Sequence, residues 1–445
     1  MTEIRVHPAP ARRRPASIGT TAPTSPSPRQ KGRILILVEN LSVPFDRRVW
    51  QESCALVEAG HQVVVVCPMG KTSDNEPHVV IDGVHIHRYP LTPATGGPVG
   101  YVREYGFALL HSLRLALRLG WRTPFDVVHA CNPPDLLLLI ALPLRLRHGT
   151  RLLFDHHDLV PELFLSRFSH GKDWLYRLSL LSERLTFALA DTVISTNESY
   201  RATAIGRGKM DPNRVHVVRS APDLSRFLPL PAEPALRRGK EHLACYLGVM
   251  GPQDGVDYAL RSIAHLRHAE GRTDFHCVFI GSGDAKEACV ELAKELRLGD
   301  CVEFTGRISD EEVTRYLSTA DVCLAPDPKN PLNDLSTMNK IMEYMAMSRP
   351  VVSFDLVEAR VSAGDAALYA RPNDEKEFGD LVGRLFDDPE RRRTMGEIGR
   401  KRVEEYLSWG TSKQHLLAAY EQLLGGRAAA TVRARSHRRR AAARR

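Results

Sequence analysis

The sequence predicts an α/β protein built from two doubly wound domains that face each other across a cleft. Apolar runs of strand length alternate with longer amphipathic stretches from Arg33 onward, and these runs fall into two series. A segment over 220–240 with four prolines and little periodicity separates the series. The chain has 445 residues, which is enough for two or three domains that each bury a core.

The first series predicts six strands, at 33–38, 62–66, 126–130, 151–154, 192–195 and 215–218. Between the first two of them we expect a helix. Asp46 can cap its start, while Val49, Leu56 and Val57 share one face and Gly60 can end it.

The second series predicts strands at 242–247, 275–280, 302–304, 322–325 and 350–354. We therefore expect a first domain over 33–222, a linker over 223–240 and a second domain over 241–410. A helix over 411–426 should pack back on the first domain. The flanking segments 1–32 and 427–445 read as a disordered basic leader and a disordered basic tail.

Charge is unevenly distributed along the chain. Residues 1–32 carry six basic side chains and one acidic, and residues 427–445 carry eight arginines and no acid, so the body is mildly acidic although the chain has a net charge of +8. A nucleic-acid-binding fold would need a basic face on the body, so we expect no nucleic-acid partner. The eight cysteines are scattered singly, which favours a reducing, cytoplasmic compartment and no structural zinc site.

The segment 327–355 carries the strongest chemical signal. A polar loop runs into a predicted helix that begins near Ser336, and free N–H groups at a helix start favour phosphate. Lys340 and Glu343 are three residues apart and so share a face, where a cation suits a diphosphate and a carboxylate suits ribose hydroxyls. An isolated pair of this kind would more often be an exposed ion pair.

This segment and several others resemble family 4 glycosyltransferases, which have the GT-B fold of two Rossmann-like domains. The resemblance covers nearly all of 33–424 and rests on RILILVENLSVPFDRRVWQESCALVEAGHQVVVVCP, FDVVHACNPPDL, LLFDHHDLVPELF, FIGSGD, VEFTGRISDEEVTRYLSTADVCLAP and NKIMEYMAMSRPVV. It implies transfer of a sugar from a nucleoside-diphosphate donor with retention of anomeric configuration and without a metal or other cofactor.

The resemblance also implies site residues. On the donor side it indicates Glu343, Lys340, Ser336, Thr337, Arg307, Ile308, Gly281, Gly283 and Gly251. The family often has two glutamates seven residues apart. Here Leu335 stands at the first position, with Asp334 beside it as a catalytic candidate. Val249 and Asp254 stand where the family has Arg and Lys, so two cations expected beside the diphosphate are absent, and Lys340, Arg307 or an arginine of the first domain must offset its charge.

On the acceptor side the candidates follow the ends of predicted strands. His157 is the first candidate for the catalytic histidine and His129 the second, although a lone histidine after an apolar strand is more often structural. Asn40, Asp46, Arg47, Arg48 and Asn132 complete this side. Asp46 to Arg48 can equally be a helix cap followed by solvated arginines.

A basic amphipathic stretch over 101–122 can lie on an anionic membrane, or it can be a surface helix with its leucines facing inward. With the basic tails it favours a peripheral site on the inner face of the plasma membrane. We therefore expect a transferase that moves a UDP-linked hexose or N-acetylhexosamine to a glycan or polyprenyl-diphosphate-linked acceptor in bacterial envelope or exopolysaccharide synthesis. The alternatives are a nucleotide-sugar epimerase of the same fold and a non-catalytic GT-B scaffold.

Overall fold

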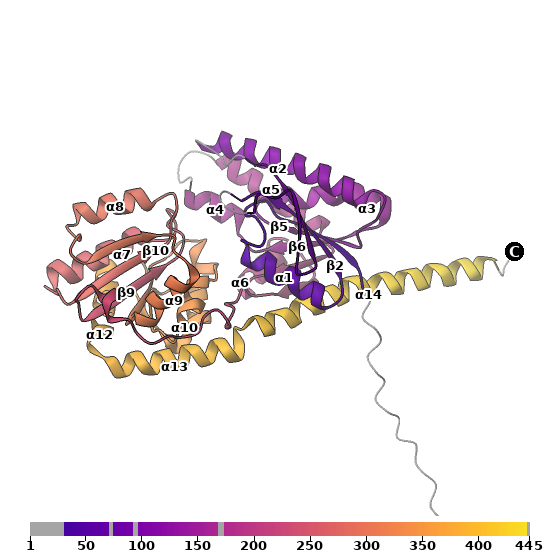
Figure 1. Cartoon of the computed structure of the whole chain (residues 1–445). Helices are drawn as coiled ribbons and strands as arrows, with labels where there is room; N and C mark the ends of the chain where they lie inside the picture. Colours follow the sequence, from indigo (N-terminus) through magenta and orange to yellow (C-terminus); the bar gives the residue numbers. More distant parts are fainter. Residues whose placement is uncertain (1–30, 71–73, 92–96, 168–172, 443–445) are drawn as a thin grey trace, which may run out of the picture. The chain divides into compact units, whose positions relative to one another are not determined.

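The computed structural model describes residues 31–70, 74–91, 97–167 and 173–442. Most of the predicted leader therefore lies outside the described residues. The remaining chain forms two lobes, each a sheet with helices on both faces (Figure 1). The predicted fold class, two doubly wound α/β domains, is confirmed.

The first lobe contains an eight-stranded sheet in the order β3-β4-β2-β1-β5-β6-β7-β8, parallel except for the β3–β4 pair. Its strands are β1 (Arg33–Leu37), β2 (Gln62–Pro68), β3 (His78–Ile81), β4 (Val84–Tyr89), β5 (Val127–Cys131), β6 (Arg151–His156), β7 (Thr192–Ser195) and β8 (Val215–Val217). Its helices are α1 (Arg47–Glu58), α2 (Gly97–Gly120), α3 (Leu142–His148), α4 (Val160–Arg167), α5 (Asp173–Leu189) and α6 (Glu198–Gly206). The β3–β4 hairpin was not predicted.

Side chains of this sheet alternate between two buried layers. Ile34 and Ile36 of β1 join one apolar cluster, and Leu35 and Leu37 join the cluster on the opposite face. This two-residue alternation within a wholly apolar run is what a parallel sheet covered on both faces requires.

The second lobe contains a six-stranded parallel sheet in the order β11-β10-β9-β12-β13-β14. Its strands are β9 (His242–Leu247), β10 (Phe275–Ile280), β11 (Val302–Gly306), β12 (Val322–Ala325), β13 (Val351–Phe354) and β14 (Ala367–Ala370). Its helices are α7 (Val256–Ala264), α8 (Lys286–Glu295), α9 (Asp310–Thr319), α10 (Asn339–Ala346), α11 (Val357–Ala363), α12 (Glu375–Asp387) and α13 (Pro389–Tyr406). Strand β14 was not predicted.

The chain then returns to the first lobe through α14 (Trp409–Ala442). Leu416, Tyr420 and Leu424 of α14 belong to the buried cluster that also holds Ile34 and Val127 of the first sheet. The helix continues to Ala442 (Figure 1), whereas the sequence predicted a disordered tail from residue 427. None of the described helices is long and apolar enough to cross a membrane. All eight cysteines are free thiols.

Candidate active site

A cavity of about 460 Å³ lies between the two lobes. In each lobe it is bordered by segments that follow the carboxyl ends of parallel strands, which is where ligands bind in sheets of this type. Its lining includes Asn40, Asp46, Arg48, His157 and Asp158 from the first lobe and Gln253, Asp254, Asn333, Ser336, Thr337 and Asn339 from the second.

Asp46 is both a helix cap and a residue of the cavity, but the alternative prediction that solvated arginines follow the cap is wrong for Arg48, which is buried. Its carboxylate accepts a hydrogen bond from the N–H of Val49 at 3.1 Å and so caps α1. Burial raises the pKa of this carboxyl, and His157 nearby opposes the rise.

His157 borders the cavity, and a buried carboxylate fixes its Nδ1. Nδ1 lies 3.0 Å from Oδ2 of Asp155, a carboxylate with no exposed surface. Burial alone would lower the pKa of His157, but the adjacent Asp155 outweighs burial and raises the pKa to about 9. At neutral pH His157 is therefore an imidazolium whose Nε2–H can donate a hydrogen bond into the cleft.

Asp155 is itself fixed by Arg48. The guanidinium donates to both carboxylate oxygens, at 2.9 Å from Nε and 2.7 Å from Nη2, and a third bond reaches the carbonyl of Val218. Arg48 was predicted to contact the acceptor. It borders the cavity, but its buried ion pair with Asp155 makes it chiefly a support for His157.

His129 and Asn132 do not reach the cavity in the way that was predicted. His129 has no exposed surface, because it lies inside β5 on the face that α14 covers, and its Nδ1 lies 2.9 Å from the hydroxyl of Tyr420. The assignment of His129 as a substrate-contacting residue is thus corrected. Asn132 is buried too, and its side-chain oxygen accepts from the N–H groups of His157 and Asp158, both at 3.0 Å. It shapes the segment that carries His157.

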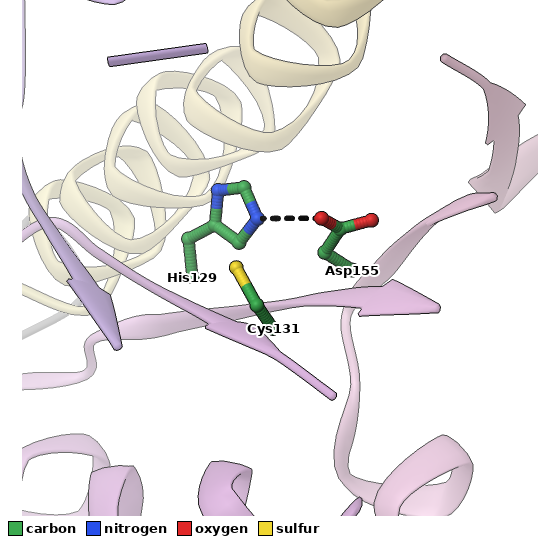
Figure 2. Close-up of side chains that lie close together, drawn as sticks. All are labelled: His129, Cys131 and Asp155. Carbon is green, nitrogen blue, oxygen red and sulfur yellow. Dashed lines mark ion pairs between the residues drawn. The ribbon is translucent and has the colours of Figure 1, made fainter. Parts of the chain in front are cut away.

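Figure 2 shows that the side chains of His129, Cys131 and Asp155 lie close together. Their candidate ligand atoms lie within 4.8 Å of one another, a spacing that a metal ion could use. Burial raises the pKa of the Cys131 thiol well above its usual range, which favours the protonated form. Since Arg48 already places a positive charge beside Asp155, the arrangement favours an ion-paired carboxylate over a metal centre.

Ser336 and Thr337 lie at the cavity and are held by the first lobe. The hydroxyl of Tyr200 lies 2.9 Å from Oγ of Ser336, and Asn197 donates to Oγ1 of Thr337 at 3.0 Å. The predicted helix does not begin at Ser336, because this residue ends a 3₁₀ turn and its hydroxyl donates back to the carbonyl of Leu332. Helix α10 starts at Asn339.

Glu343 and Lys340, predicted as a pair, have different surroundings. Oε1 of Glu343 lies 3.3 Å from Nη1 of Arg47 in the first lobe, so Glu343 faces the other lobe. Burial raises the pKa of Glu343, and Arg47 opposes that rise. Lys340 is instead buried with its ammonium 2.6 Å from Oδ1 of Asp327, so its charge is already matched inside the second lobe.

The predicted glycines bring two loops into close contact. Gly281 has a φ of +135°, and a Cβ there would lie 1.8 Å from the carbonyl oxygen of Gly248. A Cβ on Gly283 would lie 2.5 Å from the carbonyl oxygen of Met250. Any side chain would therefore separate the loops after β9 and β10. Gly251 belongs to the same turn, where its N–H donates to Asp254 at 2.8 Å.

The remaining candidates lie at the edge of the site. The guanidinium of Arg307 lies 5.1 Å from the ring centre of Phe45 in the first lobe, and Ile308 packs against the core of the second. Asp334, predicted to be catalytic, accepts from the N–H of Val357 at 2.9 Å and pairs with Lys329 at 3.0 Å. It is not among the residues around the cavity, so its position does not support a catalytic role.

Four residues of the site were missed from sequence: Glu52, Tyr200, Arg226 and Tyr420. Glu52 carried a usable signal, because it follows Arg48 by four residues on one helix face and lies 3.1 Å from it. The other three contact residues more than eighty positions away in the sequence, which no local pattern encodes.

Two family models match the chain. Residues 46–221 match the "Glycosyl transferase 4-like domain", and residues 241–388 match "Glycosyl transferases group 1". The two matches coincide with the two lobes that border the cavity. Together the matches cover more than half of the chain, which belongs to the glycosyltransferases that these models describe.

Curated relatives agree with this family. The chain is 27% identical over 218 residues to the MMP alpha-(1->4)-mannosyltransferase of Mycolicibacterium hassiacum, a match that covers 48% of this chain and 50% of the relative. It is 26% identical over 363 residues to the alpha-D-kanosaminyltransferase of Streptomyces kanamyceticus, covering 77% and 88%. The chain thus spans only about half the length of the first relative but most of the second.

Solved structures of GT-B glycosyltransferases share the fold. Sucrose-phosphate synthase from Thermosynechococcus elongatus superposes with a TM-score of 0.74 at 20% identity, covering 89% of this chain and all of the other. HepE of Anabaena, solved in complex with UDP-glucose, superposes with a TM-score of 0.64 at 13% identity, covering 88% and 100%.

Proposed function

We propose that this GT-B glycosyltransferase moves a hexose or N-acetylhexosamine from a UDP-linked donor to a hydroxyl of a glycan or lipid-linked acceptor, with retention of anomeric configuration. One observation carries the proposal: a cavity between the lobes is lined by His157 on one side and by Asn333 and residues 336–339 on the other. The UDP-glucose complex of HepE, which has the same fold, supports the choice of donor.

In this proposal the second lobe holds the nucleotide. Glu343 accepts hydrogen bonds from the ribose hydroxyls, and its partial burial strengthens such bonds. Lys340 is already paired with Asp327. The negative charge of the diphosphate is therefore balanced by arginines that lie near Glu343. Arg47 and Arg226 border a second cavity of about 250 Å³ together with Glu343. Both guanidiniums also pair with Asp310, which sits at the start of α9.

His157 supplies positive charge where the sugar is transferred. Because its pKa is raised to about 9, it donates a hydrogen bond and does not serve as a base at neutral pH. A retaining transfer through an oxocarbenium-like centre needs support for the departing diphosphate more than it needs a strong protein base. We propose that the chain's own residues suffice for this step and that no metal takes part.

We further propose that the first lobe lies on an anionic membrane in the cytoplasm. Helix α2 exposes Phe107 and Leu110 together with Arg114 and Arg118. Helix α5 exposes Trp174, Leu178, Leu181 and Leu185, whose spacing of four, three and four residues aligns them on one face. Exposed arginines at 177 and 184 flank this stripe, as an interfacial helix requires. Envelope or exopolysaccharide synthesis from a lipid-linked acceptor would suit this placement.

The experiment is a panel of nucleotide sugars added to the full chain, read first as thermal stabilisation. A donor at a hundred times its dissociation constant adds about 2.7 kcal/mol to the free energy of unfolding. The stabilising donor is then supplied with an isotopic sugar. Label that appears in a glycan or lipid extract supports transfer, and an isomerised nucleotide sugar without acceptor indicates an epimerase. If none of the nucleotides or nucleotide sugars stabilises the chain, the enzymatic proposal is wrong and the scaffold alternative stands.

A further inference from the structure

A second histidine lies behind the carboxylate that holds His157. His129 is fully buried, and its Nε2 lies 3.9 Å from Oδ2 of Asp155 (Figure 2). The same nitrogen lies 3.7 Å from Oε2 of Glu52. Both glutamate oxygens and this nitrogen are buried without a well-formed hydrogen bond. The imidazole ring of His129 therefore lies between two carboxylates. Whether Nε2 carries a proton determines whether the ring attracts or repels them.

These surroundings fix the tautomer of His129. An unprotonated Nε2 would direct its lone pair at two carboxylates, so the proton belongs on Nε2. In the neutral ring Nδ1 is then an acceptor, and the hydroxyl of Tyr420 at 2.9 Å must be the donor. Tyr420 comes from α14, the last helix of the chain, and is fully buried.

We propose that Tyr420 is a positioning residue for His157 that acts through His129 and Asp155. The Tyr420 hydroxyl keeps the Nε2–H of His129 directed toward Asp155. This N–H offsets part of the negative charge that Asp155 presents to His157. The C-terminal helix thereby sets the proton affinity of a side chain in the cleft. The proposal rests on the proposed function only in that His157 faces the transferred sugar.

Several charged groups face His157, and the test must separate Tyr420 from them. They are Asp155, His156 and Asp158 on its own segment, and Asp46, Arg48 and Glu52 at α1, while His129 on β5 contacts Asp155 from behind. Burial raises the pKa of Glu52, and the Arg48 guanidinium partly opposes that rise. Two substitutions should then move the pKa of His157 in opposite directions.

Tyr420→Phe removes only the hydroxyl. The Nε2–H of His129 is then no longer directed at Asp155, so this carboxylate attracts the imidazolium more strongly and the pKa of His157 should rise by about half a unit or more. Glu52→Gln removes a negative charge near His157 and should therefore lower the pKa of His157. The titration is followed by NMR of ¹⁵N-labelled histidine in the full chain, with the His157 signal identified from the spectrum of His157→Gln.

Tyr89→Phe is the matched control. Tyr89 is also a buried tyrosine of the first lobe but belongs to the cluster on the opposite face of the sheet. It should leave the pKa of His157 unchanged. In a transfer assay with the identified donor, the alkaline limb of kcat should move with that pKa in Tyr420→Phe, while KM for the donor stays within about twofold.

The proposal is overturned if the pKa of His157 is unchanged in Tyr420→Phe and this variant loses only as much stability as Tyr89→Phe. Tyr420 would then be a packing residue. The ¹⁵N shifts of the unsubstituted chain give a second check, because a His129 that carries its proton on Nδ1 contradicts the relay directly. Both measurements need no substrate. A chain that transfers no sugar but still shows the opposed shifts would refute the proposed function and leave the relay in place.

Discussion

Arg47 of the first lobe and Glu343 of the second form an ion pair across the cleft, with Nη1 3.3 Å from Oε1. Half of the Arg47 side chain is exposed (53%), and a pair open to water contributes no more than about 1 kcal/mol. A ligand hydroxyl or phosphate can therefore displace it at little cost. The contact keeps Glu343 directed at the other lobe and yet available to a nucleotide.

Lys340 should matter more for stability than for ligand affinity. Its ammonium and Asp327 are both buried, and removing one partner of such a pair costs about 3–5 kcal/mol. We expect Lys340→Met to lose that much free energy of unfolding in urea titrations, and Lys340→Met with Asp327→Leu to recover most of it. If Lys340→Met is as stable as the parent chain and weakens diphosphate binding alone, the diphosphate role predicted from sequence is right instead.

Stability should fall as the pH rises from 6.5 to 9. His157 has a folded pKa of about 9, above its unfolded value near 6.5, so the folded chain holds the proton more tightly and loses this advantage as the pH passes 9. The stabilisation lost is at most about 3 kcal/mol. Chemical denaturation at several pH values should show a steeper decline in the parent chain than in His157→Gln. Parallel curves for the two proteins would rule out the raised pKa.

Tyr200 should influence donor binding from the opposite lobe. Its hydroxyl bonds Ser336 at 2.9 Å and so helps to hold the cavity wall that precedes α10. We expect Tyr200→Phe to lower donor affinity several-fold, which corresponds to about 1 kcal/mol for one hydrogen bond. Tyr369→Phe serves as the control, since its hydroxyl bonds the carbonyl of Gly364 within the second lobe. Equal donor affinities in calorimetry would remove Ser336 from the donor site.

The apolar stripe on α5 should carry membrane binding. Leu181→Glu with Leu185→Glu places two charges in the stripe and should reduce sedimentation with phosphatidylglycerol vesicles by about tenfold or more. Val357→Glu with Val361→Glu on α11 has the same spacing and similar exposure in the second lobe, and should have little effect. If deletion of 1–30 and 427–445 abolishes sedimentation while the α5 variant still binds, the basic ends are the anchor.

The strands could be predicted from sequence where both faces of a sheet are covered, because such strands are continuously apolar. Strand β4 (Val84–Tyr89) was missed because histidine and arginine interrupt its pattern, although Asp82 and Gly83, both with positive φ, form a hairpin signal that could have located it.

The roles of the two candidate histidines, His157 and His129, could be distinguished only in part from the sequence. Within β5, Val127 and Cys131 share the cluster under α14, and alternation places His129 on that same face. Its burial follows once α14 is known to cover the face. Its partner Tyr420 lies 291 residues away, and this contact depends on how the whole chain folds back.

The most direct measurement is calorimetry of the identified donor with the parent chain, Glu343→Ala and His157→Ala, together with the rate of sugar transfer. We predict that Glu343→Ala weakens donor binding by about tenfold or more, whereas His157→Ala retains donor affinity within about threefold and loses most of the transfer rate. Donor affinity that is unchanged in Glu343→Ala, with transfer unchanged in His157→Ala, would contradict a donor site shared by the two lobes.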